Sequence, residues 1–363
     1  MQAGLWEKDI SLSSSGNIDF EEVYRVASEQ SVEGLVAAGL EHVIDAKVPK
    51  EVLWSFVGTA LQFEQRNKSM NGFIAELIEK MRKVGIHSIL VKGQGIAQCY
   101  ERPLWRASGD IDLLLFKENY SRASEFLLPL SINVEDEDKY SLHKAFMVKN
   151  WEVEIHGTLR TGLWKRLDKV IDDVQNDVFG GRKTRVWING NTQIYIPRAE
   201  EDVFLVFTHI LQHFFKGGIG LRQVCDLCRI LYTFKGSLNE LLLISSLKEA
   251  GVMSEWKAFG AFAVDYLGMP AEVFPLYSNA MKWKTKANRI LTCIMNTGNF
   301  GCKVDNSFRK EKLFLAKKIF ALWRYIRETF THAQIFPMDS LKVFYSMFMS
   351  GMKTTLRIWG NED

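Results

Sequence analysis

Apolar residues recur at helical spacing in two regions of the chain, one before residue 85 and one after residue 197. In residues 19–84 they lie three and four positions apart, Asp19 is a typical N-cap residue, and Pro49 begins a second helical stretch. Gly85 follows the last of these positions, as a C-terminal glycine does. After Arg198 the same spacing predicts helices over residues 200–215, 221–232, 238–250, 253–267, 279–296, 307–331 and 338–357.

The pattern changes between these regions, where short apolar runs predict strands. Predicted strands cover residues 87–91, 111–116, 143–148, 151–156, 184–188 and 192–196, and predicted helices cover 96–100 and 120–128. Lys149 and Asn150 join two of the strands as a hairpin, and residues 189–191 join another pair. We therefore expect an α+β protein, with a small mixed β-sheet core at 85–197 between an N-terminal helical region at 1–84 and a helical C-terminal domain at 198–363.

Cysteine usage and hydropathy indicate the cellular compartment in which the protein is expected. The five cysteines, at 99, 225, 228, 293 and 302, are odd in number and scattered, which fits a reducing cytosol better than a disulfide framework. The N-terminal residues lack the basic segment and apolar stretch of a signal peptide, and no run of eighteen apolar residues is present. We therefore expect a cytoplasmic protein without a transmembrane segment.

Charge is unevenly distributed along the chain. The net charge of +3 is too small to indicate a nucleic-acid partner by itself, but residues 282–327 hold twelve Lys/Arg against two acids. Aromatic residues interleaved with this charge are Trp283, Phe308, Phe314, Phe320, Trp323 and Tyr325. A solvated helical face is the default interpretation, and the alternative is a groove for nucleic acid, an anionic polymer or a membrane surface.

Two aspartates begin the most apolar of the predicted strands. Residues two apart in a strand point to the same face, so Asp110 and Asp112 project together, while Ile111 and Leu113 face the other side. Two neighbouring carboxylates repel one another and lose solvation in an apolar strand. A divalent cation between them removes this cost, and hard oxygen ligands favour Mg²⁺ or Mn²⁺. The alternative is a pair of solvated carboxylates at a strand end.

A third carboxylate lies on the predicted strand 151–156. In that strand Glu152, Glu154 and His156 share one face, and Val153 and Ile155 share the other. If this strand neighbours the strand of the two aspartates, Glu154 completes a three-carboxylate site. Such a site suits two metal ions roughly 3.5–4 Å apart, one at the attacking oxygen and one at the triphosphate.

Taken in order, these segments resemble the uncharacterised bacterial nucleotidyltransferases of the DNA-polymerase-β-like superfamily. The similarity spans roughly residues 30 to 290 and includes a downstream helical motif between His209 and Leu231. The matching residues are Lys92-Gly93-Gln94, Tyr100, Pro103, Arg106, Gly109-Asp110-Ile111-Asp112-Leu113-Leu114, Val153-Glu154-Ile155-His156, Gly220-Leu221-Arg222 and Asp226-Leu227.

The resemblance implies an Mg²⁺-dependent enzyme that moves a nucleoside monophosphate from an NTP, such as ATP, to an acceptor hydroxyl and releases pyrophosphate. Asp110 and Asp112 match the metal-binding pair of the superfamily. Glu154 matches the third carboxylate, which is expected to assist deprotonation of the acceptor hydroxyl.

The same resemblance implies a site for the nucleotide. Gly93 and Gln94 lie where the superfamily usually has a Gly-Ser pair that contacts the triphosphate, so glutamine replaces serine here. Lys92 and Arg106 bring further hydrogen-bond donors to phosphate. The loop residues before the aspartates and two residues of the downstream helices complete the expected contacts: Ser108, Gly109, His209 and Arg222.

Several alternatives stay open at this point. The acceptor is a small molecule, a sugar or a protein, and a nucleic acid is possible but not favoured, because no RNA-binding module is recognisable. A catalytically silent nucleotide-binding protein and an RNA-end-modifying transferase are the competing functions. His209 and His213 have zinc-binding spacing without a completing ligand, Cys225 and Cys228 fit a helical core, and Arg222 and Asp226 are four apart, as in a helical salt bridge. We expect the two histidines to lie near the cleft.

Overall fold

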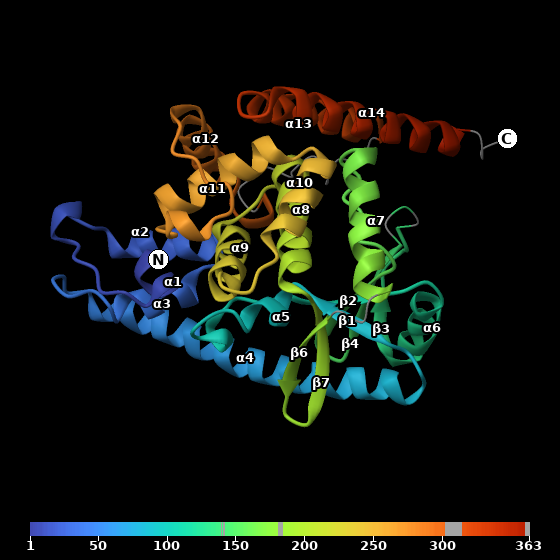
Figure 1. Ribbon diagram of the computed structural model, residues 1–363, viewed down its shortest axis with the longest axis horizontal. Coiled ribbons are helices and arrows are strands. Elements are labelled where there is room, and N and C mark those ends of the chain that lie inside the picture. Colours follow the sequence, from blue (N-terminus) through green and yellow to red (C-terminus); the bar gives the residue numbers. More distant parts are fainter. Residues whose placement is uncertain (139, 141, 181–183, 302–313, 360–363) are drawn as a thin grey trace.

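A mixed sheet lies between one long helix and a layer of shorter helices, as Figure 1 shows for the computed structural model. The structure describes residues 1–138, 140, 142–180, 184–301 and 314–359. The predicted α+β class is confirmed, with helical regions on both sides of the strands in sequence. No helix among the described residues is both long and apolar enough to cross a bilayer.

The sheet has the strand order β1-β2-β5-β4-β3. Its strands are β1 (Ser88–Val91), β2 (Asp110–Leu115), β3 (Ser131–Val134), β4 (His143–Val148) and β5 (Trp151–His156). Strands β2 and β5 run parallel, and the other neighbouring pairs are antiparallel. This central parallel pair brings the strand of the two aspartates beside the strand of Glu154.

The long helix α4 (Lys50–Lys83) covers the apolar face of this sheet, and it lies along the lower edge of Figure 1. Ile111 and Leu113 of β2 and Val153 and Ile155 of β5 are fully buried in one cluster with α4. Burying such a side chain contributes roughly 1.5–3 kcal/mol, so these four residues fix which face of each strand points inward. The alternate residues of both strands therefore point to the opposite face, away from α4.

Helices α1 (Gln2–Trp6), α2 (Phe20–Glu29) and α3 (Glu33–Leu40) precede α4. Two of these N-terminal helices, α2 and α4, start where the sequence predicts, and α1 is an additional element. The Asp19 side chain accepts a hydrogen bond from the backbone N–H of Glu22, which makes it the N-cap of α2. Pro49 is the N-cap residue of α4, and Gly85 follows the end of that helix with a φ of 72°.

The remaining helices are α5 (Gly93–Ala97), α6 (Glu118–Leu127), α7 (Lys165–Gly180), α8 (Ala199–Lys216), α9 (Leu221–Phe234), α10 (Glu240–Ala250), α11 (Met253–Leu267), α12 (Met281–Thr297), α13 (Phe314–Ala333) and α14 (Pro337–Trp359). Most of them form the layer above the sheet in Figure 1, whereas α5 and α6 lie at the level of the sheet, and α6 packs in the same apolar cluster as α4. Short 3-10 turns cover Ser13–Ser15, Pro103–Trp105, Leu128–Leu130, Ala271–Val273 and Asn299–Gly301. The core of this layer also holds residues of α1 to α4, such as Leu5, Val36 and Phe56, so the N- and C-terminal helices share one apolar cluster.

Several elements differ from the prediction. The helix expected over 96–100 begins earlier, because Lys92 and Gly93 take positive φ angles and turn the chain into α5 directly after β1. Strand β3 and helix α7 are additional elements. The pair β6 (Thr184–Asn189) and β7 (Thr192–Pro197) forms a separate two-stranded ribbon beside β1 and α4. Of the helix expected over 307–331, the part before Phe314 lies outside the described residues, as do Phe308 and Cys302.

Candidate active site

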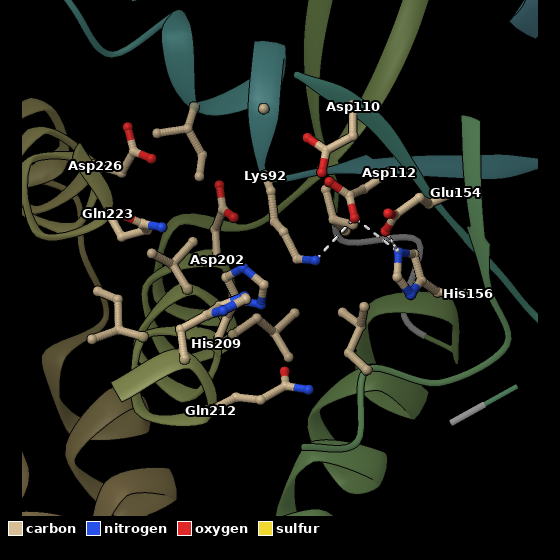
Figure 2. Close-up of a pocket in the computed structure, with 18 of the residues that line it drawn as sticks. Lys92, Asp110, Asp112, Glu154, His156, Asp202, His209, Gln212, Gln223 and Asp226 are labelled. Carbon is tan, nitrogen blue, oxygen red and sulfur yellow. Dashed lines mark hydrogen bonds and ion pairs between the residues drawn. The ribbon is translucent and has the colours of Figure 1, made fainter. Parts of the chain in front are cut away.

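A pocket of about 370 Å³ lies between the polar face of the sheet and helices α8 and α9. Figure 2 shows that its walls come from opposite sides: the sheet supplies Asp110, Asp112 and Glu154, and α8 supplies His209 and Gln212. The charged and polar residues that line it are Lys92, Arg106, Asp110, Asp112, Asp138, His143, Glu154, His156, Thr158, Arg160, Asp202, His209, Gln212, His213, Arg222, Gln223 and Asp226.

The three predicted carboxylates line the same pocket. In the parallel pairing of β2 and β5, Asp112 lies opposite Glu154 and Asp110 lies opposite Glu152. Asp110, Asp112 and Glu154 all face the cavity, because the intervening residues of both strands are buried against α4. The register of the two strands, rather than a loop, thus brings these side chains together.

A lysine and two histidines surround these carboxylates. Lys92 Nζ lies 2.9 Å and His156 Nε2 lies 2.8 Å from the same Oδ1 atom of Asp112. Glu154 Oε2 lies 3.0 Å from His143 Nε2 and 3.5 Å from His156 Nε2. Figure 2 shows the Asp112 contacts as dashed lines. The negative charge of this wall is therefore matched locally by nitrogen groups, most closely at Asp112.

The three carboxyl groups differ in their acidity because their neighbours differ. Repulsion from Asp112, together with burial and the charge of Glu154, raises the pKa of Asp110. Burial opposes ionisation of Asp112, but Lys92 and His156 outweigh it and lower the pKa of that group. Burial is likewise outweighed at Glu154, where hydrogen bonds from His143 and His156 lower the pKa. Asp110 is thus the carboxyl group with the greatest unrelieved repulsion from its neighbours.

The segment predicted to hold phosphate is only partly directed toward the pocket. Lys92 and Gly93 line the cavity at the turn between β1 and α5. The Gln94 side chain is buried on the other side, where its Nε2 donates to Asn67 Oδ1 over 2.8 Å. The expected contact between the Gln94 side chain and the triphosphate is not favoured by this orientation, because the amide is held against α4.

Arg106 is engaged within the protein. Its Nε and Nη2 atoms each donate over 2.7 Å to the carboxylate of Asp226, and Nη1 donates over 2.9 Å to Ser108 Oγ. Asp226 also accepts from the Tyr100 hydroxyl over 2.7 Å. The helical salt bridge expected between Arg222 and Asp226 is therefore replaced by a pair between Asp226 and Arg106, because the Asp226 carboxylate turns toward the loop before β2.

The loop before β2 is also fixed from α9. Arg222 lines the pocket and donates from Nη1 over 2.7 Å to the backbone oxygen of Ala107. Ser108 and Gly109 lie in this loop and are not among the residues that line the cavity. The loop residues thus connect the pocket to α9, whereas the aspartates that follow form its wall.

Helix α8 brings two imidazoles to the pocket. The rings of His209 and His213 lie 4.3 Å apart, nearly perpendicular, and both line the cavity, as expected for residues near the cleft. Burial, followed by the positive charge of Lys92, lowers the pKa of His209 well below its ordinary value. The same two causes lower the pKa of His213 to about 4. Both imidazoles are therefore neutral at physiological pH.

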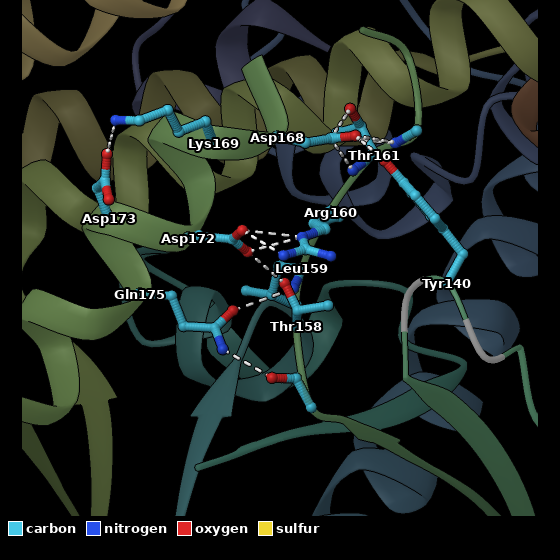
Figure 3. Close-up of polar contacts among 12 residues, drawn as sticks. Tyr140, Thr158, Leu159, Arg160, Thr161, Asp168, Lys169, Asp172, Asp173 and Gln175 are labelled. Atoms are coloured by element: carbon cyan, nitrogen blue, oxygen red, sulfur yellow. Dashed lines mark hydrogen bonds and ion pairs between the residues drawn. The ribbon is translucent and has the colours of Figure 1, made fainter. Parts of the chain in front are cut away.

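The segment after β5 forms the far end of the pocket, where it is tied to α7 (Figure 3). The buried carboxylate of Asp168 accepts from the backbone N–H of Thr161 over 2.8 Å. Asp172 pairs with Arg160 over 2.6 Å, and Gln175 donates to the backbone oxygen of Gly157 over 2.8 Å. These contacts hold Arg160 and its neighbours at the cavity, so α7 contributes to the site through this segment.

Sequence reasoning did not include His143 and His156 among the site residues. The signal was available, because a hairpin turn at Lys149-Asn150 pairs His143 with His156, and the structure has this register. Gln212 and Arg160 were also missed, and no sequence pattern marks them.

Known proteins offer three comparisons. The sequence model of a family described as "Uncharacterised nucleotidyltransferase" matches residues 16–268, which is more than half of the chain. The crystal structure of an antigenic nucleotidyltransferase-like protein from Paracoccidioides brasiliensis is similar over 51% of this chain and 90% of that chain, with 11% sequence identity and a TM-score of 0.31. Among curated proteins, no sequence matches this chain.

Proposed function

The chain belongs to this family of uncharacterised nucleotidyltransferases, and from that premise we propose that it moves a nucleoside monophosphate from an NTP, such as ATP, to an acceptor hydroxyl and releases pyrophosphate. The observation that carries the proposal is the meeting of Asp110, Asp112 and Glu154 on one wall of the pocket. Family membership supports nucleotidyl transfer in general, and the pocket chemistry supports the finer statement.

The carboxylates fit a divalent cation of the Mg²⁺ or Mn²⁺ type. They offer hard oxygen ligands, and the repulsion that raises the pKa of Asp110 is what a bound cation relieves. Asp110, Asp112 and Glu154 would hold such ions. When bound, the cation supplies charge neutralisation at the triphosphate and acidifies the acceptor hydroxyl.

The protein's own cations support binding of the triphosphate. Lys92 is a flexible donor at the cavity wall, and its ion pair with Asp112 keeps the ammonium group at the site before any nucleotide binds. Arg222 faces the cavity from α9, near the loop that leads into β2. Gly93 allows the backbone to approach the phosphates closely, since it has no side chain.

The remaining predicted contacts take different roles in the proposal. The paired Arg106 positions Ser108, and thereby the loop that leads into β2, instead of binding phosphate directly. Gln94 anchors the turn to α4 through Asn67. His209, neutral at physiological pH, offers a hydrogen bond without adding charge beside Lys92.

Glu154 is the group proposed to receive the acceptor hydroxyl. Its carboxylate stays ionised at neutral pH, because hydrogen bonds from His143 and His156 outweigh its burial. An ionised carboxylate accepts a hydrogen bond from the hydroxyl and orients its oxygen toward the α-phosphorus. The acceptor itself is proposed to be a small molecule, a sugar or a protein.

Free, buried cysteines support a cytoplasmic location as a further part of the proposal. Cys99, Cys225, Cys228 and Cys293 are all unpaired with one another and buried. Thiols of this kind persist in a reducing compartment.

In the test, nucleotides labelled at the α- or the γ-phosphate are incubated with the full-length protein, Mg²⁺ or Mn²⁺, and a cell extract as the source of acceptors. Label from the α-phosphate should transfer to an acceptor, label from the γ-phosphate should leave as pyrophosphate, and the variant D110N/D112N should abolish transfer. The control variant Asp173→Asn, which removes an exposed carboxylate on α7, should retain it. Transfer of the γ label alone indicates a kinase, and transfer of neither label by the folded protein supports the catalytically silent alternative.

A further inference from the structure

Three neighbouring strands bring two imidazoles to the carboxylates of the pocket. In the antiparallel pairing of β4 and β5, His143 lies directly opposite His156. Glu154 precedes His156 by two residues, so both side chains share the polar face of β5. Asp112 lies opposite Glu154 on β2. Four groups that bind metals thus form a compact cluster on the polar face of three neighbouring strands.

The spacing of these groups matches a first coordination shell. The ligand atoms of His143, Glu154 and His156 all lie within 4.8 Å of one another. The two imidazole nitrogens lie 3.0 Å and 3.5 Å from Glu154 Oε2. Bonds of about 2.0–2.2 Å to one ion separate neighbouring ligands by roughly 3.0–3.5 Å at angles between 90° and 110°. The two separations that involve Glu154 already fall in this range, and the separation of the two imidazole nitrogens, within 4.8 Å, would shorten when an ion binds.

The identity of the ligands indicates the class of ion. Mg²⁺ takes oxygen ligands and keeps its water, so two imidazoles add little to an Mg²⁺ site. Imidazole suits Zn²⁺ and its neighbours in the first transition series, and affinity rises from Mn²⁺ to Co²⁺ and beyond. Asp112 Oδ1 lies 2.8 Å from His156 Nε2 and is within reach as a fourth ligand.

We propose that His143, Glu154 and His156 form a site for a nitrogen-binding divalent transition-metal ion, of which Zn²⁺ and Co²⁺ are representatives, with Asp112 as the fourth ligand. The inference rests on the proposed function in one respect: the two metal sites share Asp112 and Glu154. It adds that the part of the pocket around Glu154, where the acceptor hydroxyl is proposed to bind, selects a metal ion that Mg²⁺ does not replace.

The competing explanation is that the imidazoles only pair with the carboxylates. In that case both histidines serve as hydrogen-bond donors, and a transition metal bound by the protein is held by Asp110 and Asp112 alone. The two explanations differ in whether His143 and His156 affect metal affinity and the spectrum of the bound metal.

The experiment is a Co²⁺ titration of the full-length, metal-depleted protein without nucleotide, followed by its visible absorption and by competition with Zn²⁺ and Mg²⁺. We expect one Co²⁺ bound through nitrogen, displaced by Zn²⁺ but not by excess Mg²⁺. His143→Ala and His156→Gln should each weaken Co²⁺ binding roughly tenfold or more and change the absorption bands. His87→Ala, at an exposed histidine before β1, is the matched control and should bind as the wild type does.

Equal Co²⁺ affinity and spectrum in wild type, His143→Ala and His156→Gln would overturn the proposal, as would displacement of Co²⁺ by Mg²⁺. His143→Gln, which keeps a polar group of similar reach, repeats the measurement if His143→Ala does not fold. Because no nucleotide is present, the result is independent of transfer. Nitrogen-bound Co²⁺ without transfer of labelled nucleotide refutes the proposed function alone, and transfer without the nitrogen-bound ion refutes this site alone.

Discussion

The buried ion pair between Arg106 and Asp226 allows a direct test of which contacts stabilise the site. The two side chains are only 5% and 6% exposed, and they come from positions 120 residues apart. Both bonds of the pair are 2.7 Å long, and the Tyr100 hydroxyl donates to the same carboxylate. Replacing Asp226 by leucine removes every acceptor at once and leaves the guanidinium of Arg106 without a counter-charge.

The expected cost follows from this burial. Removing one partner of a buried ion pair costs about 3–5 kcal/mol, which is a large part of the roughly 5–15 kcal/mol stability of a typical protein. The double variant R106M/D226L removes both charges, so it should recover most of that loss. It still leaves the Tyr100 hydroxyl without its acceptor, at a cost of about 1–3 kcal/mol. Adding Tyr100→Phe should remove this remaining cost.

Urea unfolding, followed by tryptophan fluorescence, measures these differences in the wild type, both single variants Arg106→Met and Asp226→Leu, the double variant and the triple variant. Asp173→Ala, which breaks the exposed pair with Lys169 on α7, is the control and should change stability by less than about 1 kcal/mol. The reasoning fails if Asp226→Leu lies within about 1 kcal/mol of the wild type, or if the effects of the Arg106 and Asp226 substitutions are simply additive.

Three further variants test the pocket and its surroundings. Lys92→Ala should weaken NTP binding roughly tenfold or more at low salt, because a charge-assisted contact to phosphate is lost, and calorimetry showing equal affinity would contradict this role. Asp110→Asn should raise the melting temperature of the metal-free protein at neutral pH, because Asp112 and Glu154 repel that carboxylate, and a lower melting temperature would exclude such repulsion. Burial lowers the pKa of His332 to about 4, so the fold favours the neutral ring and loses stability as pH falls from about 6.5 to 4. Between about pH 7 and pH 4.5, the free energy of unfolding of His332→Leu should fall by about 2–3 kcal/mol less than that of the wild type in urea titrations. An equal fall in both proteins would refute this.

Alternation along single strands predicts much of the site, because each strand buries one face. Strands β4 and β5 have the predicted limits, since a short hairpin turn joins two apolar runs. Asp110, Asp112 and Glu154 face the pocket for the same reason: their neighbours along the strand pack on α4. These features depend on residues close together in sequence, so periodicity is enough to find them.

Features that depend on distant partners are not predictable in this way. Nothing local indicates that Arg106 pairs with Asp226 rather than with phosphate, because the two approach each other only when α9 packs beside the loop before β2. The inward orientation of Gln94 likewise depends on Asn67 of α4. Strand β3 is an exposed edge strand, with Ile132 facing solvent, so it lacks the apolar alternation of a buried one.

Helix α7 is a different case, because its signal is present in the sequence. Leu167, Val170, Ile171, Val174 and Val178 recur at helical spacing, and all are buried. The helix lies within the segment expected to form the sheet core, between the strand pairs β4–β5 and β6–β7. It does not connect the parallel strands β2 and β5, because the chain passes from β2 to β5 through α6, β3 and β4. The periodicity of each segment must therefore be examined separately from the class expected for the domain around it.

The pocket and the sheet core are two consequences of the same residue alternation. Ile111, Leu113, Val153 and Ile155 hold β2 and β5 against α4 with fully buried side chains. That apolar face offsets the cost of gathering carboxylates on the other face, where Asp110 carries the strongest repulsion. A shift of one residue in the β2–β5 register would bury the acids and expose the core, so the fold cannot slip without losing both. The apolar residues of each strand thus determine the geometry of the site, and the polar residues that alternate with them determine its chemistry.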